Sequence, residues 1–334
     1  MIGKKILKKI KVAHAICRDN WQYSGKYSRE GAIKKARLPL FFDMLYSELS
    51  IGSDVHNYYM FGFEKLSKKE RLEWITNHIN AHTAARHSGK DVWKLFEDKA
   101  KFNERFKDFV KRRWLDTRSA TTDEVSTFIN DLGRVIVKPL NMSAGEGIYL
   151  LHATESDKIS ELESRIQEGH HCLLEEVKEN VAALKALNPT SLNTIRVVTC
   201  LNSQGELHFL CTVLRMGSTD SCIDNSIGGG ITSYIDMKTG CLSSPAVDRK
   251  RQYFTHHPRT GIELVGYQIP HWDEVLEFAR KIAYVEPRAH YVGWDIALCS
   301  DGIELIEGNI PPGEGIIQVC DQKPKRRQLM EYLA

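Results

Sequence analysis

Residues 293–313 read GWDIALCSDGIELIEGNIPPG, and this segment sets acidic side chains among residues that otherwise have the pattern of buried strands. The alternation of apolar and polar side chains predicts two strands, 294–299 and 303–307. The three residues between them end in Gly302, which suits a type I turn followed by a left-handed glycine. The segment is therefore predicted to fold as a tight β-hairpin.

The register of this hairpin brings two carboxylates together. The predicted turn sets Cys299 opposite Ile303. Counting back along both strands, Asp295 then faces Glu307, and Asn309 lies two residues further along the same face. Like charges directly opposite each other destabilise a sheet, so a positive group is expected between the two carboxylates.

Arginines and a metal ion are both candidates for that positive group. Arg196, in LNTIRVVTCL, and Arg215, in TVLRMG, each occur in a strand-like run, where arginine is seldom fully buried unless it is paired. Either fits a bidentate grip on phosphate or carboxylate, and a structural ion pair is the alternative. Two carboxylates and an amide oxygen also form the hard, oxygen-rich set that Mg²⁺ accepts. The residues alone leave both interpretations open.

Three further motifs could contact a phosphorylated ligand. In VIVKPLNMSAGEGIYLL, Lys138 ends a strand and precedes a loop of small residues, whose N–H groups could close over phosphate; a plain hairpin is the alternative. In HCLLEEVKEN, residues 175–177 could present acceptors to an adenine edge, or simply form a solvent-facing turn. In DNSIGGGITSYID, the glycines at 228–230 suit either a substrate loop or a simple turn.

The composition is that of an ordinary soluble globular protein, with 27% charged and 42% hydrophobic residues among 334. A formal charge of +3 is too small to indicate a nucleic-acid partner. The eight cysteines form no CxxC pair, so most are expected to be buried free thiols of a cytoplasmic protein. No run of 18 apolar residues predicts a membrane span. The basic residues 1–17 allow peripheral membrane contact, but a solvated helix is the favoured interpretation.

Helical patterns dominate the first hundred residues, and strands and turns dominate after residue 115. Ser67 and Glu70 form a capping box that opens a helix, and apolar residues at helical spacing continue it through 66–87. Residues 91–110 indicate further helix, broken near Lys99. Because hairpins and helices alternate without regular βαβ repetition, the predicted class is α+β with largely antiparallel sheets.

The order of these motifs resembles the ATP-grasp superfamily, most of all its branch associated with sugar transfer and polysaccharide loci. The similarity extends over residues 50–320 and is carried by VIVKP with its small-residue loop, LNTIRVVT, DNSIGGGI and the segment 293–313. It implies an ATP-grasp fold, in which two α+β lobes hold ATP between their sheets. The implied divisions are a helical N-terminal region at 1–95, a small lobe at 96–177, a large lobe at 178–322 and a basic tail at 323–334.

The resemblance also implies a role for each matched residue. Nucleotide contacts are implied for Lys99, Lys138, Ser143, Gly145, Gly147, Glu175, Glu176 and Val177. Mg²⁺ contacts are implied for Asp295, Asn309 and Glu307, the last bridging two ions. Arg196 and Arg215 would act on the γ-phosphate and the acceptor, and Asn225, Gly229 and Gly230 would contact substrate. Two departures from the family pattern are AGEG in the phosphate loop and Asn180 where an acidic ribose ligand is common.

The implied activity is that of a carboxylate–amine ligase with ATP and Mg²⁺ as cofactors. ATP phosphorylates a carboxylate, and an amine attacks the acylphosphate to give an amide, ADP and phosphate. The partners would be a small-molecule carboxylate and an amine or sugar acceptor, in surface polysaccharide or sugar-conjugate biosynthesis. Two alternatives keep the same site: a kinase that phosphorylates a hydroxyl, and a catalytically silent nucleotide-binding scaffold. The first ninety residues lie largely outside the matched motifs, so they are expected to shape the acceptor pocket.

Overall fold

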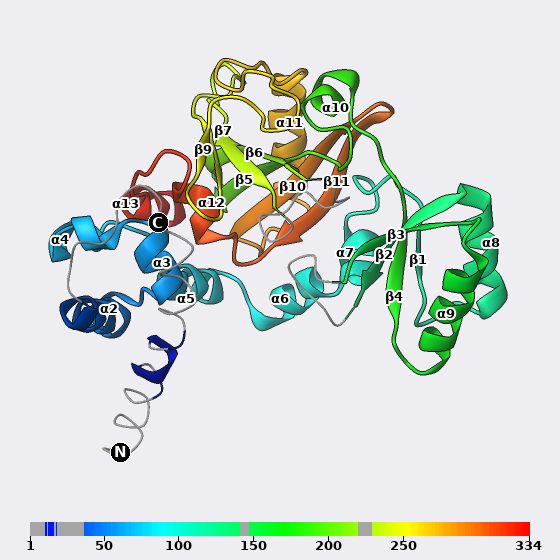
Figure 1. Ribbon diagram of the computed structural model, residues 1–334, viewed down its shortest axis with the longest axis horizontal. Coiled ribbons are helices and arrows are strands. Elements are labelled where there is room, and N and C mark those ends of the chain that lie inside the picture. Colours follow the sequence, from blue (N-terminus) through cyan, green and yellow to red (C-terminus); the bar gives the residue numbers. More distant parts are fainter. Residues whose placement is uncertain (1–10, 12, 17, 19–36, 141–146, 220–228) are drawn as a thin grey trace.

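Two antiparallel sheets organise the protein (Figure 1). The computed structural model describes residues 11, 13–16, 18, 37–140, 147–219 and 229–334. The smaller sheet has the order β1-β4-β2-β3, formed by β1 (Trp114–Asp116), β2 (Arg134–Pro139), β3 (Tyr149–His152) and β4 (Cys172–Glu176). The larger sheet has the order β11-β10-β5-β6-β7-β8-β9, formed by β5 (Thr194–Leu201), β6 (Leu207–Met216), β7 (Ile231–Tyr234), β8 (Ala246–Asp248), β9 (Tyr253–Phe254), β10 (Tyr291–Cys299) and β11 (Gly302–Asn309). The predicted α+β class with antiparallel sheets is confirmed.

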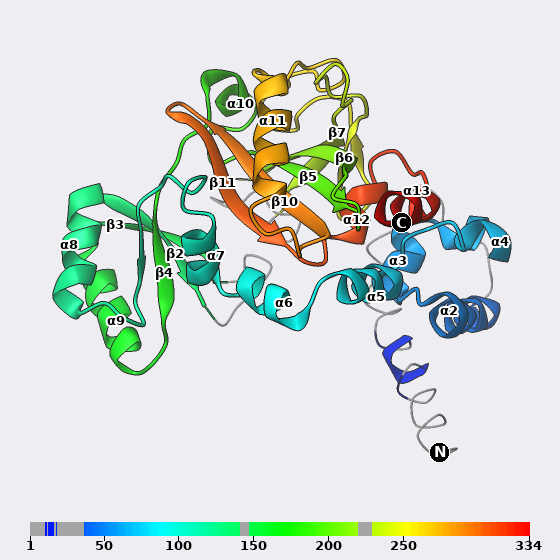
Figure 2. The ribbon, with the colours of Figure 1, turned by 180° about the vertical axis from the view of Figure 1, so that it is seen from behind.

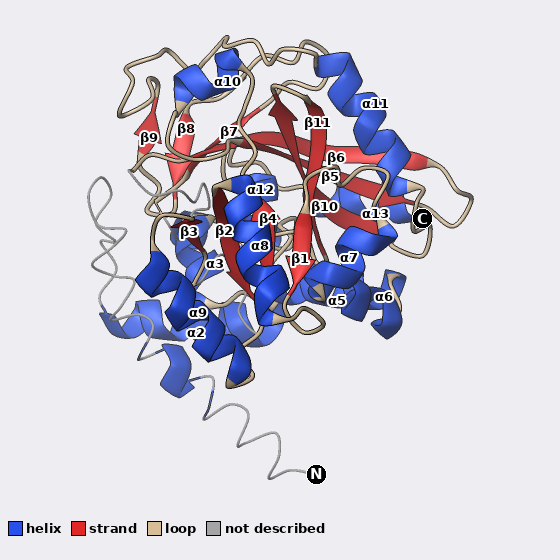
Figure 3. Ribbon diagram, turned by 90° about the vertical axis from the view of Figure 1, so that its right-hand side faces the viewer, coloured by secondary structure: helices blue, strands red, loops and turns tan. Residues whose placement is uncertain are grey.

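Two helices cover the outer face of the smaller sheet, α8 (Thr122–Leu132) and α9 (Ser156–Gln167), and they stand in front of it in Figure 3. The side chain of Thr121 caps α8, in the capping box that its spacing from Glu124 predicts. Gly133, with φ +71°, ends the helix in the left-handed conformation. The apolar face of α8 packs against the sheet in one cluster, whose fully buried members include Ile129, Val135 and Leu151.

One face of the larger sheet is covered by α11 (Trp272–Ala283), which lies in front of it in Figure 2. Val275, Ala279 and Ile282 recur at helical spacing and are fully buried. They share a core with alternate residues of β5 and β10, such as Ile195 and Trp294. Because strand side chains alternate between faces, the intervening residues of these strands point to the opposite face, where the cavity described below lies.

The first helices of the described chain pack beside the larger sheet together with the C-terminal helices (Figure 1). These elements are α2 (Arg37–Ile51), α3 (Val55–Met60), a 3₁₀ turn (Phe63–Lys65), α4 (Lys68–Arg71), α5 (Asn77–His87), α12 (Glu314–Gln318) and α13 (Arg326–Leu333). Ile75 and Ala84 enter one apolar cluster with Val198 of β5 and Leu329 of α13. No helix in the described part of the chain has the length and apolar character needed to cross a bilayer.

The single helix predicted over 66–87 is wrong, because the chain forms α4 and α5 with a break between them. The capping box of Ser67 is present, but α4 ends after four residues. The main chain of Ile75 in the break is bound by the side chain of Gln318, which accepts from its N–H and donates to its carbonyl, both at 2.9 Å. A contact from far along the sequence thus replaces the local helical hydrogen bonds.

The segment that leads into the smaller sheet forms α6 (Lys90–Glu97) and α7 (Lys99–Arg105), and α10 (Ala182–Leu187) follows that sheet. The predicted break near Lys99 is confirmed, because Asp98 ends α6 and its side chain caps α7 by accepting from the N–H of Lys101. All six described cysteines are free, and five of them are buried, as their positions in apolar runs predict.

The turn of the β10–β11 hairpin differs from the prediction. Cys299 pairs with Gly302, not with Ile303, so the turn has two residues instead of three. A β-bulge at Ile306 then restores the register, because Ile296 pairs with Leu305 while Asp295 pairs with Glu307. The predicted pairing of Asp295 with Glu307 is therefore confirmed, but an extra residue in β11 produces it.

Candidate functional site

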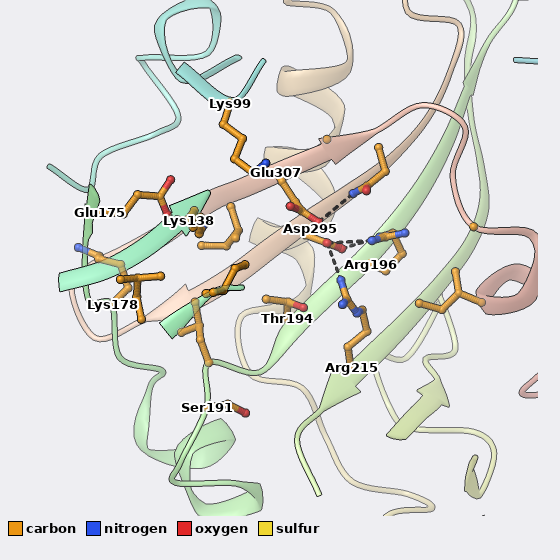
Figure 4. A pocket seen from close by; sticks show the side chains of 18 of the residues that line it. Lys99, Lys138, Glu175, Lys178, Ser191, Thr194, Arg196, Arg215, Asp295 and Glu307 are labelled. Atoms are coloured by element: carbon orange, nitrogen blue, oxygen red, sulfur yellow. Dashed lines mark hydrogen bonds and ion pairs between the residues drawn. The ribbon is translucent and has the colours of Figure 1, made fainter. Parts of the chain in front are cut away.

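A cavity of about 980 Å³ lies between the two sheets and gathers most of the predicted site residues (Figure 4). Those that line it are Lys99, Lys138, Glu175, Glu176, Val177, Arg196, Arg215, Asp295, Glu307 and Asn309. Ser143, Gly145 and Asn225 lie outside the described residues. Gly147 is exposed, and neither it nor Gly229 and Gly230 are among the described residues that line the cavity.

The strand register explains why charged side chains converge on the larger sheet. Asp295 of β10 pairs with Glu307 of β11 on one side and with Arg196 of β5 on the other. Arg215 of β6 lies two residues beyond the partner of Arg196, so it points to the same face. The four side chains therefore form a row across four neighbouring strands. Gly293 leaves room for this row, because a Cβ there would lie 3.1 Å from Cδ of Arg196.

Two arginines neutralise Asp295. Its Oδ1 accepts from Nε of Arg196 at 2.5 Å, and its Oδ2 accepts from Nη2 of Arg196 at 2.8 Å and from Nη1 of Arg215 at 2.5 Å. Burial would raise the pKa of Asp295, which is 1% exposed, but the two guanidinium groups outweigh it and hold the pKa well below its ordinary value. The arginine pairing that the sequence left open is therefore present for this carboxylate.

Glu307 has no comparable compensation. Within the described part of the chain it has no ion-pair partner, and its Oε1 accepts from Nδ2 of Asn309 at 3.2 Å. Burial raises the pKa of Glu307, and the neighbouring charge of Asp295 raises it further. Burial lowers the pKa of Lys99, and the nearby charge of Glu307 offsets part of this lowering. Glu307 thus faces the cavity without an ion-pair partner among the described residues, and the charges of Lys138 and Arg215 offset only part of the rise in its pKa.

On the smaller sheet, Glu175 is held by two cations. Nζ of Lys138 lies 2.5 Å from its Oε2, and Nη2 of Arg112 lies 2.9 Å from its Oε1. Burial would raise the pKa of Glu175, but Arg112 and Lys138 more than offset it and lower the pKa to about 2. The carboxylate of Glu175 is therefore a fixed anion that positions Lys138 beside the cavity.

Arg112 connects the two sheets, a role that no pattern in the sequence indicated. It is 4% exposed, and its Nη1 donates to Glu304 at 2.8 Å and to the carbonyl of Leu305 at 2.6 Å. Its Nη2 donates to the carbonyl of Ile306 at 2.9 Å as well as to Glu175. Arg112 thus binds the bulge that sets Glu307 opposite Asp295, and through Glu175 it also positions Lys138.

Asn180 has a structural role in the described chain. Its Nδ2 donates to the carbonyls of Asn193 and Leu298, at 3.0 and 3.2 Å, and its Oδ1 accepts from the N–H of Asn193 at 2.7 Å. All the hydrogen-bonding atoms of the side chain are therefore engaged by main chain, although the residue also lines the cavity.

The helices that precede residue 90 also reach the cavity. His56 and Met60 of α3 line it, together with Glu314 at the start of α12. The sequence carries no motif for these three residues, and only the tertiary packing of α3 against α12 brings them to the site. In Figure 1, α3 and α12 lie on the left of the view and the smaller sheet lies on the right.

Comparisons with known proteins bear on the same region. A family model described as sugar-transfer associated ATP-grasp matches residues 90–331. The search of curated proteins found no significant match. The family match includes both sheets and stops short of α2–α5.

Solved structures with a similar fold include three ligases or synthetases. D-alanyl-alanine synthetase A from Vibrio cholerae is 14% identical with a TM-score of 0.44, over 73% of this chain and 62% of that one. The ATP-grasp ligase PsnB with its minimal precursor is 16% identical with a TM-score of 0.44, over 73% of this chain and 64% of that one. An ADP complex of N5-carboxyaminoimidazole ribonucleotide synthetase is 11% identical with a TM-score of 0.49, over 74% of this chain and 54% of that one. The chain thus spans between 54% and 64% of their lengths.

Proposed function

Because the chain belongs to the sugar-transfer-associated ATP-grasp family and has the ATP-grasp fold, we propose that it is an ATP- and Mg²⁺-dependent ligase that joins a carboxylate to an amine. The reaction forms an acylphosphate from the carboxylate and ATP, and the amine displaces phosphate from it. We further propose that the chain acts in the cytoplasm and that its product belongs to surface polysaccharide or sugar-conjugate biosynthesis; the description of the family supports only the link to sugar transfer.

The observation that carries this proposal is Glu307, a carboxylate that lines the cavity beside Asp295 and has no ion-pair partner among the described residues. The donor set fits Mg²⁺, because Glu307 and Asn309 offer hard oxygens and Glu307 lacks an ion-pair partner among the described residues. Asp295 would share its carboxylate between the ion and the arginines. When bound, Mg²⁺ would supply charge neutralisation at the phosphates of ATP.

The chain's own residues would act by position and charge. Lys138 and Lys99 would hold the phosphates, and Glu175 would keep Lys138 in place before the nucleotide arrives. Arg196 and Arg215 are fixed by Asp295, so they would present guanidinium groups to the transferring phosphoryl group and the carboxylate without reorganisation. No side-chain nucleophile is required, since catalysis of phosphoryl transfer depends mostly on positioning and electrostatics.

Calorimetry with Mg·ATP tests the nucleotide and metal site. We expect saturable binding to the native protein and loss of ATP turnover in Glu307→Gln, because a ligand oxygen is replaced by an amide. The same change removes the repulsion between Asp295 and Glu307, so the melting temperature should be equal or higher. Glu277→Gln, on the exposed surface of α11, is the matched control and should behave as the native protein. Full turnover in Glu307→Gln would refute the metal assignment.

Trapping with hydroxylamine tests the reaction type. The protein is incubated with Mg·ATP, hydroxylamine and a panel of small carboxylates. A hydroxamate that depends on ATP and on one carboxylate is the expected result, because hydroxylamine attacks an acylphosphate. A stable phosphorylated acceptor in place of a hydroxamate would show a kinase instead.

A further inference from the structure

One end of the cavity is built by elements on both sides of the family boundary. His56 and Met60 come from α3, outside the matched residues, while Glu314 comes from α12, inside them. The two helices pack closely, since a Cβ at Gly315 would lie only 2.7 Å from Sδ of Met60. This end of the cavity therefore depends on a segment that the family pattern does not describe.

Glu314 is held in place by neutral donors. Its Oε1 accepts from Nδ2 of Asn57 at 2.9 Å, and its Oε2 lies 3.3 Å from Nδ2 of Asn80. Asn80 is 1% exposed, and its Oδ1 has no hydrogen-bond partner among the described residues. The two amides fix the orientation of the carboxylate without neutralising it, and no described lysine or arginine forms an ion pair with it.

Three of the other acids that line the cavity have roles already described or hydrogen bonds of their own, and Glu307 is assigned above to the metal ion. Glu175 and Asp295 are paired with cations, as described above. Asp248, which also lines the cavity, uses its Oδ1 to accept from the N–H groups of Lys250 and Gln252, both at 2.8 Å. Glu314 is thus the carboxylate at this end that is both oriented and available for a cationic group.

Part of the wall near Glu314 is apolar. The side chains that line the cavity there and belong to one hydrophobic cluster are Met60, Val247, Ile316 and Val319. A carboxylate beside such an apolar wall favours a ligand with one positive charge on a short apolar stem, because burial strengthens a charge-assisted hydrogen bond and the stem covers apolar surface.

We propose that this end is the acceptor subsite, in which Glu314 binds the amino group of a primary amine whose apolar stem lies against Met60 and Val319. This inference rests on the proposed ligase function and narrows its amine substrate to a primary amine with an apolar stem. Glu314 would orient the amine toward the row of Asp295, Arg196 and Arg215, where the acylphosphate would form. The helical N-terminal region would then determine acceptor specificity through α3.

A pair of probes matched in size tests the subsite. n-Propylamine and 1-propanol are titrated into the protein saturated with Mg²⁺ and a non-hydrolysable ATP analogue, and binding is followed by saturation-transfer NMR. We expect the amine to bind at least about tenfold more tightly than the alcohol, since a hydrogen bond to a charged group contributes that much. Glu314→Gln keeps an acceptor for Asn57 and should abolish the preference. Glu277→Gln, with the same change of charge on the surface, should retain it.

The possible failures are distinguishable. If the nucleotide analogue binds but the native protein shows no preference for the amine, or if Glu314→Gln keeps the preference, the subsite is wrong and the ligase proposal stands. If the analogue does not bind at all, the proposed function fails. The two probes are then compared without nucleotide, and equal binding of both would overturn the subsite as well.

Discussion

Replacing Arg112 with methionine tests how the two sheets are held together. Arg112 pairs with Glu304 of β11 and with Glu175 of β4, and these carboxylates are 1% and 4% exposed. Burial would lower the pKa of Arg112, but the charges of Glu175 and Glu304 more than offset it and raise the pKa. Methionine keeps much of the volume and removes the charge, so the change reports on the ion pairs more than on packing.

The two carboxylates differ in what remains after the change. Glu175 keeps Lys138 at 2.5 Å. Among the described residues, the hydrogen-bond donors that remain to Glu304 are the main-chain N–H groups of Lys111 and Arg112, at 3.2 to 3.3 Å. One buried carboxylate, not two, therefore loses its counterion. Removing one partner of a buried ion pair costs about 3 to 5 kcal/mol, so we expect a loss of that size in the free energy of unfolding.

Urea unfolding followed by circular dichroism and tryptophan fluorescence measures this loss. Arg113→Met is the matched control, because Arg113 is the next residue and its pair with Asp131 is half-exposed, so the loss should be at most about 1 kcal/mol. In Arg112→Met/Glu304→Gln no carboxylate is left without a counterion, and this double variant should be more stable than Arg112→Met. Two results would contradict this explanation: a double variant no more stable than Arg112→Met, or a loss in the free energy of unfolding no larger for Arg112→Met than for Arg113→Met. In either case an uncompensated buried charge is not the cause of the destabilisation.

Two other predictions follow from buried titratable groups. Burial raises the pKa of Asp54 to about 6, so the folded state binds more protons than the unfolded state and the free energy of unfolding should rise as pH falls from 6 to 4. Asp54→Asn should remove this rise, on the order of 2 kcal/mol, in thermal melts across that range; an unchanged pH profile would contradict it. Cys241 is half-buried, whereas burial raises the pKa of Cys211 to about 12, so a thiol reagent should label Cys241 in the native protein and Cys211 only on unfolding. Mass spectrometry of labelled peptides measures both rates, and equal rates would contradict the burial of Cys211.

The sequence predicts the pairing within the β10–β11 hairpin, but it does not predict the contacts that produce this pairing. The pairing of Asp295 with Glu307 follows from alternation, but it depends on a bulge at Ile306 whose carbonyl is bound by Arg112. Arg112 stands in the basic run KRRW, where a solvated residue is the ordinary expectation. Its partners are 63 and 192 residues away, so no local pattern could identify it as the buried member of that run.

Local signals succeed where the stabilising contacts are themselves local. The capping box of Thr121 and the break at Asp98 involve residues three apart, and both are present as predicted. The helix predicted over 66–87 fails for the opposite reason, because Gln318 binds the main chain of Ile75 from 243 residues away. The position of Glu314 beside the cavity could not be predicted from the sequence either, because it depends on the packing of α3.

The packing of the first helices against the larger sheet also bears on how the protein can be divided. Similarity to the family starts at residue 90, but a protein shortened to that point would uncover the apolar surface of Val198 and Leu329 that Ile75 and Ala84 cover. Gln318 would lose both of its hydrogen bonds to the main chain of Ile75 in the same step. The boundary drawn by homology is therefore not a boundary of the folding unit, and any shortened form meant to keep its fold has to retain α5 and the segment before it.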